Sequence, residues 1–229
     1  MRRLSLARHP GGLPAAFVLP FELAEGEVAH FARHGIACPP AIARSVPKRR
    51  AEYLAGRLAA LAALAEAGVT ADDLAIAPSR APMWPAGCTG SITHAAGIAA
   101  AVALRADALR GVGIDIERIA VAGALEAIVR SVIDAAERGA LGALADRLGE
   151  AMALTIAFSA KESFYKATAA TVGRVFDFSA LKIVGVNEEV IVAETSEALA
   201  AALPQGTRFE LGYSLLDETT VITSCAWTR

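Results

Sequence analysis

The sequence has few of the features that mark secreted, zinc-binding or nucleic-acid-coating proteins. Among its 229 residues are three cysteines, Cys38, Cys88 and Cys225, which are widely spaced and form no CxxC pair. This pattern argues against a disulfide framework and against a cysteine zinc site, and it is typical of reduced thiols in the cytoplasm. The net charge is −2 and no Lys/Arg tail occurs, so any anionic ligand must be met by a local basic cluster.

Long uninterrupted apolar runs are also missing. The longest, residues 95–104, is about half the length that a membrane-spanning helix requires, and it contains a glycine. The apolar segment at residues 13–21 is interrupted by Pro14 and Pro20 and lacks a small-residue cleavage signature. We therefore expect a soluble, cytoplasmic protein without an export signal. A hydrophobic content of 55% is ample for one large domain or two half-size ones.

The N-terminal half contains one strongly predicted helix followed by strands. Residues 46–67 are rich in alanine and leucine at helical spacing, and Gly68 is a plausible stop. Prolines and glycines at residues 77–90 predict an ordered loop. Short β-rich runs predict strands at residues 91–93, 98–104 and 112–117.

The C-terminal half predicts a similar order of elements. Helices are expected across residues 123–169, with breaks near Gly139 and Gly149 and the last helix at about 155–170. A strand at 181–186, a helix at 196–202 and a hairpin at 208–227 follow. Aligning Ser91 with Ser214 matches small and apolar positions, which suggests two halves that each pack one helix on a small antiparallel sheet. Chance similarity between two hairpins explains this match almost as well.

The segment GVGIDIER at residues 111–118 places two carboxylates on one side of a strand. Apolar residues alternate with Gly113, Asp115 and Glu117, so the last two side chains leave the same face. Adjacent carboxylates repel unless a cation lies between them, and Mg²⁺ is the cation that prefers oxygen ligands of this kind. A solvated strand end carrying two acidic residues is the alternative.

The segment FSAKESFYKA at residues 158–167 falls on a predicted helix. Phe158, Glu162 and Lys166 are four residues apart and share one face, whereas Lys161 is turned by about 100° from Glu162. A simple Glu162–Lys166 ion pair within the helix is the alternative to a functional role.

Two further segments suit anionic ligands. Arg50 and Arg57 share a face at the start of the first helix with Arg49 beside them, where the helix dipole also favours anions. A solvated polar face is the alternative. In GSITHA, at residues 90–95, Thr93 and His94 would suit contact with a phosphate, although a lone histidine is more often a satisfied core residue.

These four segments, in this order, resemble the 4′-phosphopantetheinyl transferases, and specifically the Sfp-like group of the enterobactin synthetase component D type. The resemblance runs from about residue 30 to residue 167 through KRRAEYLAGR, APMWPAGCTGSITHA, GVGIDIE and FSAKESFYKA. It implies an α+β pseudo-dimer of two similar halves, each a small antiparallel sheet packed with a long helix. The halves would be residues 1–110, with the basic helix and the SITH hairpin that bind coenzyme A, and residues 111–229, with the metal site and the KE motif. The active site is expected between them.

The resemblance also implies roles for individual residues. The metal ligands would be Asp115, Glu117 and Glu162, and Glu162 and Lys166 would be catalytic. Coenzyme A would be bound by a basic and hydroxyl set: Arg49, Arg57, Arg80, Thr93, His94, Lys161 and Lys166. Phe158 replaces the tryptophan common in the family and keeps an aromatic anchor.

The implied activity is transfer of the 4′-phosphopantetheine arm of coenzyme A to a serine of an apo acyl, aryl or peptidyl carrier protein, with Mg²⁺ and release of 3′,5′-ADP. The subgroup favours siderophore or other secondary-metabolite synthesis, as in an enterobactin synthase complex. The carrier is expected to dock on residues 119–133, unless that segment is buried in the core, and two halves in one chain predict a monomer. The alternatives are a magnesium-dependent nucleotide or coenzyme A phosphohydrolase and a non-catalytic coenzyme A-binding module. The carboxylate triad with Lys166 argues against the binding module, and the lack of GxSxG and P-loop motifs gives the hydrolase no support.

Overall fold

The protein divides into two compact units in the computed structural model, which describes residues 1–6, 12–78, 80–107, 109–188 and 190–229. Of the described residues, the first unit contains 1–5, 14–78 and 80–107, and the second contains 6, 12–13, 109–188 and 190–229. Each unit combines an antiparallel sheet with one long helix, so the α+β fold class of two similarly built halves is confirmed. The assignment of functions to residues 1–110 and 111–229 stays a prediction. In the described parts of the chain, no helix has the length and apolar character needed to span a membrane.

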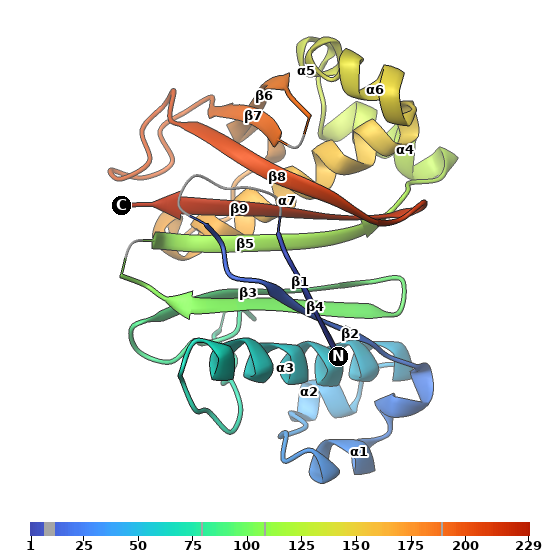
Figure 1. Cartoon of the computed structure of the whole chain (residues 1–229), viewed down its shortest axis with the longest axis vertical. Helices are drawn as coiled ribbons and strands as arrows, with labels where there is room; N and C mark the ends of the chain where they lie inside the picture. The colour runs from blue at the N-terminus through green and yellow to red at the C-terminus, as the bar shows by residue number, and fades with distance from the viewer. Residues whose placement is uncertain (7–11, 79, 108, 189) are drawn as a thin grey trace. The chain divides into compact units, whose positions relative to one another are not determined.

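The first unit is a four-stranded sheet with a long helix along it (Figure 1). The strands β1 (Arg2–Leu4), β2 (Ala16–Pro20), β4 (Ile98–Arg105) and β3 (Cys88–Ala95) pair in that order, and every pairing is antiparallel. A 3-10 turn (Leu23–Gly26) and the short helices α1 (Val28–Arg33) and α2 (Pro40–Ala43) precede the long helix α3 (Pro47–Glu66).

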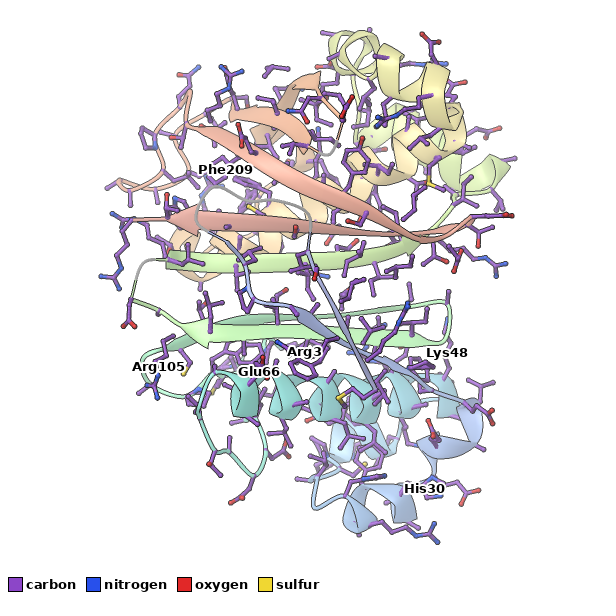
Figure 2. All side chains as sticks on the ribbon, in the orientation of Figure 1. Arg3, His30, Lys48, Glu66, Arg105 and Phe209 are labelled. Atoms are coloured by element: carbon purple, nitrogen blue, oxygen red, sulfur yellow. The ribbon has the colours of Figure 1, made fainter. Side chains whose placement is uncertain are left out.

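Helix α3 confirms the helix predicted at residues 46–67. It begins with Pro47, whose fixed φ suits the first helical position, and alanines fill much of its buried face. These small side chains allow a close approach to the sheet, because a Cβ on Gly56 would lie 2.9 Å from Cγ2 of Ile92. Figure 2 shows Glu66, at the end of α3, beside Arg3 of β1, with which it forms an ion pair.

The second unit is a five-stranded antiparallel sheet in the order β5-β9-β8-β7-β6. Its strands are β5 (Leu109–Arg118), β6 (Leu181–Val186), β7 (Val190–Thr195), β8 (Arg208–Asp217) and β9 (Thr220–Thr228). Its helices are α4 (Ala122–Ser131), α5 (Ala135–Ala140), α6 (Gly142–Leu148), α7 (Glu150–Val172) and a 3-10 turn at Phe178–Ala180. Helix α7 supplies the centre of the core, where Phe164 packs edge-on against Phe209 of β8 with ring centroids 4.9 Å apart.

Two glycines bring β5 unusually close to α7. A Cβ on Gly113 would lie 1.8 Å from the carbonyl oxygen of Ser163, and one on Gly111 would lie 1.9 Å from that of Ala167. Only glycine therefore fits at these two positions, since the obstructing atoms belong to the backbone of the helix. The next residue on this face of the strand is Asp115, which is carried against the same helix.

The predicted helix at residues 196–202 is wrong. This segment forms turns and an isolated bridge between Ala200 and Leu203, and the preceding strand β7 was not predicted. The alanines favour a helix only weakly, whereas burial of Leu199 and Leu203 and the hydrogen bond from Thr195 Oγ1 to the carbonyl of Pro204 hold the turn. Strands β1 and β2 were also not predicted, and α7 begins five residues before the expected position, directly after Gly149.

Candidate active site

Asp115 is the best-anchored carboxylate of the predicted metal triad. It lies on β5, is 5% exposed, and accepts a hydrogen bond at Oδ2 from Ser159 Oγ on α7, over 2.9 Å. Ser159 and Ser163 each share a hydrogen bond with the hydroxyl of Thr223, over 2.9 and 2.7 Å. Thr223 is the cross-strand partner of Asp115 on β9, so strand pairing and helix packing together orient this carboxylate.

Lys166 supplies a positive charge to the same place. Its Nζ donates to Asp115 Oδ1 over 2.6 Å and to the backbone carbonyl of Ile114 over 3.2 Å. The simple Glu162–Lys166 ion pair considered from the sequence is not the contact that the structure shows for this amine, which pairs with Asp115 on β5. Because its side chain is only partly buried, Lys166 remains accessible to a ligand.

Glu117 and Glu162 share this electrostatic environment. Burial raises the pKa of Glu117 to about 7, with a further rise from the negative charges of Asp115 and Glu162 and an opposing effect of Lys166. Burial, followed by the charge of Asp115, also raises the pKa of Glu162. A carboxyl with a raised pKa holds and releases a proton closer to neutral pH than an exposed one, which suits a general base.

The donor set fits Mg²⁺ in its chemistry. The three carboxylates are partly or fully buried and repel one another, and a hard divalent cation between them would stabilise this arrangement. Within the described residues, however, no three His, Cys, Asp or Glu side chains already lie in a geometry that would hold a metal ion. The structure thus brings the three predicted ligands into one charged environment without closing a coordination sphere.

A pocket of about 300 Å³ opens beside Glu162. It lies between α7 and the segment that follows it, and its wall is largely apolar and aromatic. Phe178 in this wall packs against Phe158 with ring centroids 5.6 Å apart, which gives the residue that replaces the family tryptophan an aromatic partner. The lining residues are Lys161, Glu162, Phe164, Tyr165, Val175, Phe176, Asp177, Phe178 and Leu181.

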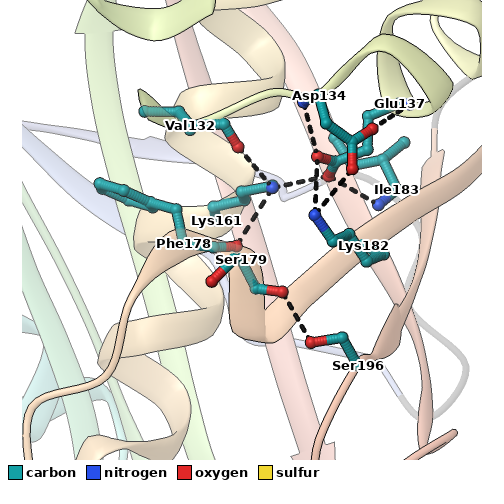
Figure 3. Close-up of polar contacts among 9 residues, drawn as sticks. All are labelled: Val132, Asp134, Glu137, Lys161, Phe178, Ser179, Lys182, Ile183 and Ser196. Atoms are coloured by element: carbon teal, nitrogen blue, oxygen red, sulfur yellow. Dashed lines mark hydrogen bonds and ion pairs between the residues drawn. The ribbon is translucent and has the colours of Figure 1, made fainter. Parts of the chain in front are cut away.

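Lys161 lies close to Glu162 in sequence but has different partners. Its amine donates to the carbonyls of Val132 and Phe178 and pairs with Glu137, as Figure 3 shows. The side chain is buried, so its predicted contact with coenzyme A stays a prediction, and its observed contacts are all with protein oxygens.

A second charged cluster lies in the first unit, where the start of α3 faces β3. The guanidinium of Arg49 lies 2.8 Å from Nε2 of His94, and Glu52 Oε2 lies 3.6 Å from both Arg49 and the other ring nitrogen of His94. Lys48 approaches Glu52 to 3.8 Å and is largely exposed. Arg49 and His94, which were predicted to bind coenzyme A, are thus brought together with a buried carboxylate behind them.

The other predicted coenzyme A residues of this unit lie apart from the cluster. Arg57 is 5% exposed, stacks over Tyr53 with 4.7 Å from its guanidinium carbon to the ring centroid, and lies 3.8 Å from Asp73. Thr93 is buried and, as the neighbour of His94 on a strand, faces the opposite side of the sheet. Arg80 is exposed in the loop with φ of 68°, a conformation that non-glycine residues rarely adopt.

Comparisons with known proteins identify the chain. Residues 39–104 match the 4′-phosphopantetheinyl transferase N-terminal domain, and residues 111–208 match the 4′-phosphopantetheinyl transferase superfamily. Enterobactin synthase component D of Salmonella typhi is 36% identical over 223 residues, which cover 92% of each chain. The chain belongs to the 4′-phosphopantetheinyl transferases. The resemblance recognised in the sequence and the enzyme class it implied are confirmed.

Other 4′-phosphopantetheinyl transferases match over shorter regions. PptT of Mycobacterium tuberculosis is 47% identical over 78 residues, which is 34% of each chain, and Svp of Streptomyces mobaraensis is 37% identical over 138 residues, covering 60% of this chain and 55% of Svp. As a member of this family, the chain is an enzyme that uses coenzyme A as the donor of the phosphopantetheinyl group.

Sequence reasoning missed the residues that support Asp115. Ser159 and Ser163 are in the recognised FSAKESFYKA segment, four residues apart and therefore on one face, so helical spacing alone could have found them. Thr223 lies 108 positions after Asp115, and only the strand pairing reveals it.

Proposed function

We propose that this 4′-phosphopantetheinyl transferase modifies a serine of a carrier protein in siderophore synthesis, using Mg²⁺ held by Asp115, Glu117 and Glu162. The observation that carries the metal assignment is the shared environment of these three carboxylates and Lys166, in which burial and mutual repulsion raise two carboxyl pKa values. The siderophore assignment rests on the relatives named enterobactin synthase component D, one of which matches over 92% of its length.

The bound metal would neutralise negative charge on the pyrophosphate of coenzyme A and so lower the barrier to its cleavage. Asp115 is held in place by hydrogen bonds from Ser159 and Lys166. Glu117 and Glu162 are partly exposed, which leaves their oxygens accessible to an ion and to substrate.

Glu162 and Lys166 provide the proton and charge chemistry in this proposal. The carrier serine hydroxyl gives its proton to Glu162 while its oxygen attacks the β-phosphorus of coenzyme A. The bond from that phosphorus to the bridging oxygen breaks, and 3′,5′-ADP leaves with the electron pair. Lys166 stabilises the charge that develops on the leaving phosphate or donates a proton to it, since its amine is already directed to this site through Asp115.

We assign coenzyme A contacts to both clusters. Arg49 and His94 are proposed to bind the 3′-phosphate, supported by their 2.8 Å contact and by the exposure of Arg49. Thr93, Arg57 and Arg80 are proposed as further coenzyme A ligands; Thr93 and Arg57 are buried in this structure, and Arg57 stacks on Tyr53. The apolar pocket beside Glu162 has the size and character to hold the thin pantetheine arm.

Carrier docking is proposed on α4. Of the predicted segment 119–133, Ile128, Val132 and Ile133 are buried in the core, whereas Val121 and Val129 are 75% and 38% exposed. Burial in the core therefore applies to part of the segment, and the exposed valines are the proposed carrier contact. The protein is further proposed to be cytoplasmic and monomeric. Light scattering tests the monomer, which should have the mass of one chain.

The deciding experiment is intact-mass spectrometry of apo carrier proteins incubated with the enzyme, coenzyme A and Mg²⁺. A gain of about 340 Da, the phosphopantetheinyl group expected from this chemistry, should appear on a siderophore carrier, disappear with EDTA and return with added Mg²⁺. The Glu162→Ala variant should abolish it, while Glu210→Ala, an exposed glutamate on β8, should not.

Each unfavourable outcome has a distinct meaning. Near-normal turnover by Glu162→Ala would reject its role as base and ligand. Cleavage of coenzyme A without any carrier gain would favour the phosphohydrolase, and binding without cleavage would favour the binding module.

A further inference from the structure

The amine of Lys161 is fully engaged inside the second unit. Its Nζ lies 2.6 Å from Glu137 Oε1, 2.8 Å from the carbonyl of Val132 and 3.1 Å from the carbonyl of Phe178 (Figure 3). A lysine ammonium has three N–H donors, so three oxygens use all of them. Since the residue is 2% exposed, this arrangement leaves the amine no donor directed to a ligand.

Glu137 extends this contact into a network that joins three elements. Its Oε1 also accepts from the backbone N–H of Ile183 on β6, over 3.0 Å, and its Oε2 accepts from that of Asp134 at the start of α5, over 3.0 Å. Lys182 lies 3.7 Å from Glu137 Oε2 and donates to Asp134 over 2.8 Å at the solvent side. The carboxylate of Glu137 is therefore as completely satisfied as the amine it pairs with.

The Lys161 contacts reach the wall of the pocket beside Glu162. The carbonyl of Phe178 accepts a hydrogen bond from Lys161. Phe178 lines that pocket together with Phe176 and Asp177, which belong to the segment after α7. Val132, the other carbonyl partner, follows the last residue of α4. Lys161 thus ties α7 at the position next to Glu162 to the pocket wall on one side and to the end of α4 on the other.

We propose that Lys161 is a positioning residue: with Glu137 it fixes the Phe178 segment against α7 and so shapes the pocket that receives the pantetheine arm of coenzyme A. This role rests on the proposed function of that pocket. It differs from a direct contact between the Lys161 amine and the phosphates, because all three donors of the amine go to protein oxygens and the amine acts on the pocket through the backbone carbonyl of Phe178.

Steady-state kinetics of three variants of the full chain test the proposal. Lys161→Met keeps the length of the side chain and removes the amine, and Glu137→Gln removes the charge of its partner. Both should raise the KM for coenzyme A by roughly 10-fold while kcat stays within about 3-fold, since a loss of binding that is equal in the ground state and the transition state raises KM and leaves kcat unchanged. The double variant should be no worse than the worse single one, because the two residues act as one unit.

Lys182→Met is the matched control. Lys182 belongs to the same network through Asp134 and Glu137, but its described contacts do not include Val132 or Phe178, and its side chain is one-third exposed. Its KM for coenzyme A should stay within about 2-fold of the parent. A fall in kcat confined to Lys161→Met, with Glu137→Gln unaffected, would instead show direct contact with the transferring group and overturn the proposal.

Hydrogen exchange supplies a readout that needs no substrate. In Lys161→Met and in Glu137→Gln, the amides of residues 173–180 should exchange faster, while those of β8 and β9 should not change. Unchanged exchange at residues 173–180 in both variants would overturn the positioning role even if the wild-type enzyme is fully active. A wild-type chain that modifies no carrier would overturn the proposed function, and the exchange data would still decide the role of Lys161.

Discussion

The close approach of β5 and α7 makes Gly113 the most sensitive position near the proposed metal site. In Gly113→Ala the new Cβ would lie 1.8 Å from the carbonyl oxygen of Ser163, and essentially no real Cβ contact is shorter than 3.0 Å. The strand and helix must therefore separate by 3.0 − 1.8 = 1.2 Å, and the obstructing atom is backbone that cannot rotate away. Overpacking of a core costs about 1–3 kcal/mol, and this case should reach about 3 kcal/mol or more.

The same displacement should reduce activity, because it moves Asp115 relative to Glu162. A misplacement of about 1 Å can cost up to roughly 100-fold in turnover. Urea denaturation followed by circular dichroism measures the stability loss. Gly139→Ala is the control, since its added Cβ would meet no described atom within 4 Å apart from its own stretch of helix, and the change should stabilise helix α5 by about 0.5–1 kcal/mol. A Gly113→Ala protein as stable and active as wild type would refute the close packing on which this reasoning depends.

Three further predictions concern other parts of the molecule. Hydrogen bonding to Lys182 lowers the pKa of Asp134 to about 2 from 3.8, so the pair stabilises the fold above about pH 4 and this stabilisation is lost as the pH falls through about 2. The pair is about half exposed, and Asp134 also caps α5. Asp134→Ala should therefore lower the free energy of unfolding by about 1–2 kcal/mol at pH 7 and by less near pH 2. Urea denaturation at both pH values measures the difference. Arg49→Ala should raise the dissociation constant for 3′,5′-ADP by about 10-fold or more in calorimetry, as expected for a lost charge-assisted hydrogen bond, and an unchanged constant would remove Arg49 from the phosphate site. Burial raises the pKa of the Cys225 thiol, which is fully enclosed, so mass spectrometry after thiol labelling should find it unmodified in the folded protein while the other two cysteines react.

Local sequence patterns were sufficient where a single period decides the structure. The spacing of leucines predicted α3 within one residue at each end, and alternation on β5 placed Asp115 and Glu117 on one face. The four-residue spacing of Glu162 and Lys166 likewise predicted that both side chains lie on one face of α7. The amine of Lys166 donates to Asp115, and the negative charge of Asp115 raises the pKa of Glu162.

Patterns do not reveal the contacts of a side chain whose partners come from distant segments. Arg57 has the spacing of a phosphate ligand, but Tyr53 and Asp73 enclose it, and Asp73 comes from the loop after α3. Lys161 stands in a recognised motif, yet its environment depends on Glu137, 24 residues earlier in the chain. Neither outcome follows from residue spacing, because each depends on which segments pack together.

The paired contacts between β5 and α7 have a geometrical consequence. Moving two residues along a strand advances about 6.7 Å, and moving four residues along a helix advances about 6.0 Å. Successive steps therefore bring Gly111 to Ala167, Gly113 to Ser163 and Asp115 to Ser159, with an accumulated mismatch of only about 1.4 Å over the two steps between them. A strand repeat of two and a helix repeat of four thus run nearly in phase for the length of this site, so that neither element needs a bulge or a kink to bring Asp115 to Ser159.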